Sequence, residues 1–193
     1  MNRLHHFVDR IANGKTMAGL LAVAFSLVAY VNLAGGPLTQ HWFLRLSNGI
    51  PWLDGNLFYS AAKASAAVDA MGHAGRQAYL LFYTTFDLVF PLAYSFALAV
   101  TLAVIFRSAF AADSWIQRLS LLPFLAGMFD YLENITIASM LIRYPSPTPV
   151  AAALAGWFTL IKWLFVPLGL LLIGIGLLRL LWNRVARSNA TLS

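Results

Sequence analysis

The chain lacks cysteine and has few charged residues. None of its 193 residues is cysteine, and only 10% are charged. The first absence excludes disulfides, thiolate metal sites, iron–sulfur clusters and a cysteine nucleophile. The second excludes a water-soluble globule, because so few polar side chains cannot cover its surface. With 60% hydrophobic residues and a mean hydropathy of +0.73, the chain is expected to be an integral membrane protein.

Clusters of basic residues are also lacking. The net charge is +6, but lysine and arginine occur singly beside apolar runs. Proteins that follow a phosphate backbone need a basic patch, so nucleic acid is not an expected partner. Single basic residues at the ends of apolar runs instead favour contact with membrane lipid. The histidine spacing fits no metal site, and no motif indicates a cofactor.

Four apolar runs predict four transmembrane helices in a single domain over residues 1–193. Each run reaches or approaches the length of about 20 residues that crosses a bilayer. The runs cover residues 17–34, 79–106, 119–142 and 151–181. The first is too long for an ordinary signal-peptide core, so we expect it to remain as a helix. The predicted fold class is all-α, a polytopic four-helix transmembrane bundle.

The connection over residues 35–78 is expected to be a long outer loop. More lysine and arginine flank the apolar runs on the side of the two termini, which predicts that both termini are cytoplasmic. Within the loop, Ser60 can cap a short helix over residues 61–71, and Gly72 can end it. Its weak apolar stripe favours a position on the membrane surface or over the end of the bundle.

Five charged or amide side chains lie deep inside the apolar runs. A charge at the centre of a span costs about 2.5 to 3.5 kcal/mol, so each should face the protein interior and have a partner. The five are Asp87 in the second run, Asp130, Glu133 and Asn134 in the third, and Lys162 in the fourth. A helical rise of about 1.5 Å per residue brings them to a similar depth in the outer half of the bundle. The sequence predicts a charged pocket there.

Three of these residues share one face of the third helix, because Glu133 and Asn134 follow Asp130 by three and four positions. Together with Asp87, the predicted pocket then holds three carboxyl groups against the single ammonium of Lys162. Either carboxyl groups are protonated at neutral pH or a cation lies among them. Both alternatives remain open.

The second run adds hydroxyl groups and a proline. Tyr83, Asp87 and Tyr94 follow one another at helical spacings of four and seven. Proline has no amide hydrogen, so Pro91 should leave the carbonyl of Asp87 without its helical bond. Pro167 should do the same in the fourth run. Kinked helices with free carbonyls often line polar cavities in membrane proteins.

Several short motifs carry a resemblance to a known family. They are Tyr59-Ser60, the segment from Gly72 to Arg76 leading into Tyr79, Asp87-Leu88-Val89-Phe90-Pro91, Asp130-Tyr131-Leu132-Glu133-Asn134 and Lys162-Trp163. Over roughly residues 50–180 the chain resembles an uncharacterised bacterial family of four-helix integral membrane proteins. The resemblance implies that the polar residues belong together and that the membrane is the bacterial cytoplasmic (inner) membrane. By architecture alone the chain is similar to the emopamil-binding and sigma-2-receptor-like bundles, from which no residue is carried over.

The leading hypothesis is a pocket that binds a small cationic or amphipathic ligand, or a lipid headgroup. The acidic groups would be Asp87, Asp130 and Glu133, with Lys162 paired to one of them; Asn134, Tyr83 and Tyr94 would orient the ligand. An alternative is an intramembrane enzyme that acts on a lipid or isoprenoid by carboxyl acid/base catalysis. Proton or cation transport is another. A fourth is a structural or assembly subunit whose charges pair with a membrane-protein partner.

Overall fold

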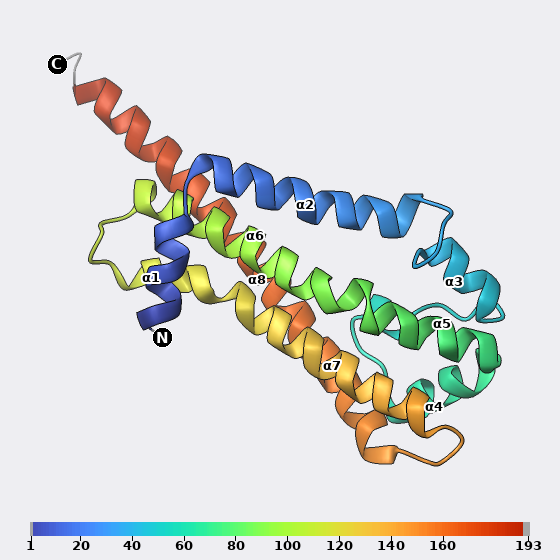
Figure 1. Ribbon diagram of the computed structural model, residues 1–193. Helices are drawn as coiled ribbons and strands as arrows, with labels where there is room; N and C mark the ends of the chain where they lie inside the picture. Colours follow the sequence, from blue (N-terminus) through green and yellow to red (C-terminus); the bar gives the residue numbers. More distant parts are fainter. Residues whose placement is uncertain (1, 191–193) are drawn as a thin grey trace.

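The computed structural model describes residues 2–190, and all the regular structure in this range is helical (Figure 1). The all-α fold class is therefore confirmed. The elements are α1 (Asn2–Ile11), α2 (Gly14–Leu33), α3 (Gln40–Leu46), η1 (Leu53–Gly55), α4 (Ala61–Ala70), α5 (Gly72–Thr84), α6 (Phe86–Ala109), η2 (Trp115–Leu121), α7 (Pro123–Arg143) and α8 (Pro149–Ala190), where η marks a 3-10 helix.

Three helices are long and apolar enough to cross a membrane: α2, α6 and α8. They correspond to the first, second and fourth predicted spans. The third predicted span corresponds to α7, which has 21 residues but includes Asp130, Glu133 and Asn134. Because these polar residues lower its hydropathy, α7 does not qualify as a span by length and composition.

The prediction of one continuous helix over residues 79–106 is wrong. The chain leaves the helical conformation at Thr85, whose φ is −124° and ψ is −82°, so α5 ends there and α6 begins. The hydroxyl of Thr85 donates to the carbonyl of Leu81 at 2.6 Å, and that of Thr84 donates to Leu80 at 2.9 Å. Hydroxyls that compete for carbonyls in this way weaken the helical ladder. A hydropathy pattern does not register this competition.

Two other boundaries differ from the prediction for local reasons. The third run begins with the 3-10 helix η2, and α7 starts only at Pro123, because proline fits the first turn of a helix and not its interior. The fourth helix extends to Ala190, beyond the apolar run that ends near residue 181. Hydropathy marks where a helix can meet lipid, whereas helical hydrogen bonding continues through its polar end.

The loop over residues 35–78, predicted to be the outer loop, folds into a compact cap over one end of the long helices. The predicted short helix is confirmed as α4, and the Ser60 side chain accepts from the amide of Lys63 at 3.2 Å. Gly72 follows with a φ of +68°, a conformation that favours glycine. The loop also contains α3 and η1, which the sequence did not predict. Phe43, Tyr59, Met71 and other buried side chains of this cap pack with α7 and α8 in one core.

The opposite end of the bundle is held by α1, which the sequence did not predict. It packs against α6 and η2, and Arg107 donates hydrogen bonds to the carbonyls of Asp9 and Ala12. Helix α1 and the C-terminal end of α8 lie at this same end of the bundle (Figure 1). Between the two ends, α2 packs mainly against α6 and has no fully buried residue. The wall that α2 forms is therefore loosely packed.

Candidate functional site

Helices α7 and α8 are joined by a buried ion-pair cluster. The Lys162 ammonium lies 2.7 Å from Oε2 of Glu133 and 3.0 Å from Oδ1 of Asp130. All three side chains are buried, and Glu133 is 0% exposed. Because Glu133 and Asp130 face α8 from the same side of α7, one lysine can pair with both carboxylates. The partner that the sequence required for Lys162 is thus found on α7.

Each of these two carboxylates also accepts a hydrogen bond from a tyrosine. The Tyr94 hydroxyl donates to Oδ2 of Asp130 at 3.0 Å, and the Tyr59 hydroxyl donates to Oε1 of Glu133 at 3.0 Å. Burial, followed by the negative charge of Glu133, raises the pKa of Tyr59 above its usual value. The Tyr59 phenol therefore stays protonated and donates. Asp130 and Glu133 therefore each have a cation and a phenol, and Oε2 of Glu133 has the ion pair with Lys162 but no hydrogen bond of regular geometry.

A glycine allows Tyr59 to reach this cluster. A Cβ at Gly156 of α8 would overlap the carbonyl oxygen of Tyr59. Only glycine permits so close an approach of loop and helix backbones. The sequence indicated Tyr59 only through a motif of the resemblance, and no signal marked Gly156.

Asp87, in contrast, is buried with one side-chain oxygen that has no partner. It is 3% exposed, and its Oδ2 has no hydrogen-bond donor within reach. The amide of Asn134 instead donates to the backbone carbonyl of Asp87 at 3.4 Å. This is the carbonyl that Pro91 was predicted to leave free. The Oδ1 atom of Asn134 also lacks a partner. Native proteins contain few such groups, and each one needs an explanation.

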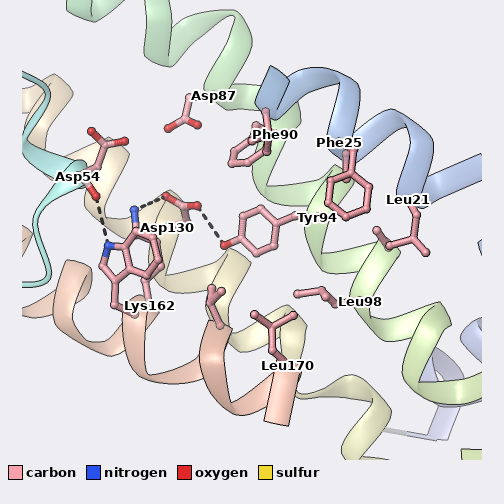
Figure 2. Close-up of a pocket in the computed structure, with 15 residues that line it drawn as sticks. Leu21, Phe25, Asp54, Asp87, Phe90, Tyr94, Leu98, Asp130, Lys162 and Leu170 are labelled. Atoms are coloured by element: carbon pink, nitrogen blue, oxygen red, sulfur yellow. Dashed lines mark hydrogen bonds and ion pairs between the residues drawn. The ribbon is translucent and has the colours of Figure 1, made fainter. Parts of the chain in front are cut away.

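The structure adds Asp54, which the sequence analysis did not place in the site. Its Oδ1 accepts from the Tyr79 hydroxyl at 3.3 Å, and its carbonyl accepts from the indole of Trp163 at 3.2 Å. These contacts hold η1 beside the cluster (Figure 2). Burial raises the pKa of Asp54, and the positive charge of Lys162 partly offsets that rise. Asp54 precedes Asp130 by 76 positions. Helical spacing therefore could not predict that Asp54 belongs to the site.

Tyr83 lies in α5, beside Tyr79. Its hydroxyl donates to the hydroxyl of Tyr79 at 2.8 Å, and Tyr79 in turn contacts Asp54. The break at Thr85 separates Tyr83 from the helix that carries Asp87. Tyr83 therefore supports the loop aspartate and does not touch the predicted carboxylates.

The acidic groups lie at one end of a cavity of about 380 Å³ between α2, α6 and α8. Figure 2 shows Asp54, Asp87 and Asp130 at this end, while Leu21 and Leu170 lie at the other. The cavity reaches the molecular surface, because the lining residues Phe25 and Leu170 are 69% and 55% exposed. It is an apolar slot with an acidic end.

A second cavity of about 440 Å³ lies beside the loop that is predicted to be outside. This space is called the outer cavity. Four residues line both cavities: Asp54, Asp87, Phe90 and Trp163. The two cavities are therefore adjacent, and Asp87, with its unpaired oxygen, lines both. Three predicted site residues line neither cavity: Tyr83, Glu133 and Asn134.

The acidic groups now outnumber the single ammonium by three, since Asp54 joins Asp87, Asp130 and Glu133. In residues 2–190, no group of three His, Cys, Asp or Glu side chains is arranged to hold a metal ion. No family model, curated protein or solved structure matches the chain. Function is therefore inferred from the geometry of the cluster and the cavities.

Proposed function

We propose that this protein binds a cationic amphiphile, with the charged nitrogen against Asp87 and Asp54 and the apolar chain in the cavity between α2, α6 and α8. The observation that carries the proposal is the buried carboxyl group of Asp87, which has an unpaired oxygen at the acidic end of an otherwise apolar slot. Such a combination complements a ligand that has one cationic end and one apolar end.

The charges favour a cation. A carboxylate without a partner is costly to bury, and a cationic group removes that cost by pairing with it. The nearest cation in the chain, Lys162, is already shared by Asp130 and Glu133. Asp87 and Asp54 therefore depend on a proton or on a ligand for neutralisation. An anionic amphiphile of the same length would meet repulsion from both.

The cavity wall supports access from the bilayer. Helix α2 has no fully buried residue, and the exposed side chains of Phe25 and Leu170 line the cavity. An apolar chain can pass between α2 and α8 without crossing a polar layer. A free amine and an amine-bearing lipid headgroup share this chemistry, so the ligand can come from solution or from the membrane itself.

In this proposal four helices, α2, α6, α7 and α8, span the bacterial inner membrane with both termini in the cytoplasm. Helix α7 can be included because Asp130 and Glu133 are buried against α8 and are hidden from lipid. The shared position of α1 and the C-terminal end of α8 agrees with termini on one side (Figure 1). Since the chain has no native cysteine, single cysteines can report topology.

The topology test uses Ser146→Cys between α7 and α8 and Ala112→Cys between α6 and η2, both at exposed positions. A membrane-impermeant maleimide added to intact cells is expected to label position 146 and to label position 112 only after permeabilisation. The reverse pattern would show that the protein has the opposite orientation. Labelling of both positions in intact cells would contradict the span count.

The binding test compares dodecylamine, dodecanol and dodecanoate by calorimetry on protein in nanodiscs. Dodecylamine is expected to bind most tightly, and Asp87→Asn should weaken its binding by about 10- to 100-fold, the range of one hydrogen bond to a charged group. The matched control is Asp69→Asn, because Asp69 is an exposed carboxyl on α4. Equal binding of all three compounds, or equal loss in both variants, would contradict the proposal.

A further inference from the structure

The outer cavity contains hydrogen-bonding groups that the proposed ligand would leave unused. Its wall includes the side chains of Asn32, Gln40, Asn56 and Trp52. The Nε1 atom of Trp52 is buried and has no acceptor. The indole ring is held by stacking on Phe82, with ring centroids 4.4 Å apart, and on Phe43 at 5.2 Å. A fixed, buried donor without an acceptor is costly unless a ligand supplies one.

The outer cavity adjoins the first cavity at Asp54 and Asp87, a pair called here the acidic junction. Asp54 and Asp87 line both spaces, and Oδ2 of Asp87 lacks a donor just as Nε1 of Trp52 lacks an acceptor. A ligand nitrogen at the junction would therefore have an apolar slot on one side and an unused donor on the other. Oδ2 of Asp87 calls for a donor or a cation on the ligand, and Nε1 of Trp52 calls for an acceptor.

We propose that the outer cavity is a second subsite, and that the ligand is a long-chain amine with a neutral hydrogen-bond acceptor, such as a hydroxyl or an amide, on the side of the nitrogen opposite the chain. The acceptor receives the Trp52 indole hydrogen while the nitrogen pairs with Asp87. This inference rests on the proposed function, because it places the same cation in the same junction and adds the identity of the polar end.

A neutral acceptor is favoured over a phosphate or carboxylate. The two carboxyl groups at the junction face the outer cavity and would repel an anion. Lys63 contacts the lining residue Asn56, because its ammonium donates to Oδ1 of Asn56 at 2.6 Å, and Lys63 is exposed to solvent. Its charge is therefore screened and directed at the amide. Amino alcohols and amino amides are the chemical classes that fit.

The test uses two probes that differ in one atom position: N-(2-hydroxyethyl)dodecylamine and its isostere N-propyldodecylamine. Both carry the same chain and the same cationic nitrogen. The full-length protein in nanodiscs is expected to bind the hydroxyethyl compound about two- to tenfold more tightly, the range of one neutral hydrogen bond. Trp52→Phe keeps an aromatic ring between Phe43 and Phe82 and removes the indole donor, so it should bring this ratio to one.

The matched control is Trp115→Phe, because Trp115 is exposed in η2, away from both cavities, and its loss should leave the ratio unchanged. Equal binding of the two amines by the wild type, or an unchanged ratio in Trp52→Phe, would overturn the second subsite. If both amines bind more tightly than dodecanol while the ratio is one, the proposed function stands and only this inference fails. If neither amine binds more tightly than dodecanol, the proposed function fails.

Discussion

The carboxyl cluster has a paired half and an unpaired half, and the two are built from similar residues. In the paired half, Asp130 and Glu133 share Lys162 and each accepts a tyrosine hydroxyl. In the unpaired half, Asp87 has an oxygen without any donor, and the Asp54 side chain accepts from the Tyr79 hydroxyl but has no ion-pair partner within 4 Å among the described residues. The paired half lies between α7 and α8, whereas the unpaired half lies where two cavities meet. The first half joins two helices, and the second is the half to which the proposed function assigns the ligand.

Removing Lys162 should have the largest effect on the free energy of unfolding, because it breaks the paired half. Lys162→Met leaves Asp130 and Glu133 buried without a cation, which typically costs about 3 to 5 kcal/mol of folding free energy. Unfolding in mild detergent, followed by near-UV circular dichroism, measures the loss. Adding Asp130→Asn and Glu133→Gln to the same chain should recover most of it. A Lys162→Met variant as stable as the wild type would show that the pairing does not join α7 and α8.

Moving Tyr59 should weaken the paired half without changing any charge. A Cβ at Gly156 would overlap the Tyr59 carbonyl, so Gly156→Ala must displace the loop from α8 and is expected to cost about 1 to 3 kcal/mol. The matched control is Gly174→Ala, because a Cβ at Gly174 meets nothing within 4 Å. That change should be neutral or stabilising. Equal unfolding free energies for the two variants would contradict the close approach.

Neutralising Asp87 in the unpaired half should not lower the free energy of unfolding, in contrast to the two changes above. Asp87→Asn replaces a buried carboxyl, one oxygen of which has no donor, with a neutral amide, so the ligand-free protein is expected to be unchanged or stabilised by up to about 1 kcal/mol. The same unfolding measurement applies, with Asp69→Asn as the control. A loss as large as that of Lys162→Met would mean that Asp87 belongs to the paired structure.

The smallest effect should be a pH dependence that comes from Asp54. Burial raises the pKa of Asp54 in the folded state above its usual value of 3.8, so folding favours the protonated form. Its contribution to stability is present below the unfolded pKa and is lost as the pH rises through the folded pKa. Asp54→Asn removes this loss and keeps an oxygen for Tyr79.

The melting temperature of Asp54→Asn relative to the wild type should therefore increase between about pH 4 and pH 8, the window that begins at the unfolded pKa. Asp113→Asn, in the turn before η2, is the control for a general effect of lost negative charge. A difference that is constant over this range would contradict a raised pKa for Asp54.

Much of the site followed from helical spacing. The three-and-four spacing after Asp130 placed Glu133 and Asn134 on one face, and the cost of a charge in lipid required a partner for Lys162. Pro91 predicted the free carbonyl that Asn134 reaches. Asp54 and Trp52 could not be found in this way, because loop residues have no regular spacing and approach the helices only after the chain has folded.

The amino-acid sequence by itself determined the all-α class, the three long apolar helices and the polar groups that interrupt the apolar runs, since hydropathy and helical period are local properties. Only the tertiary structure decided which carboxyl groups have partners. That outcome depends on a glycine that admits Tyr59, on the helix break at Thr85 and on the loop that brings Asp54 beside Asp87. Each of these is a contact between segments distant in sequence or a competition for hydrogen bonds, and neither can be read from local pattern.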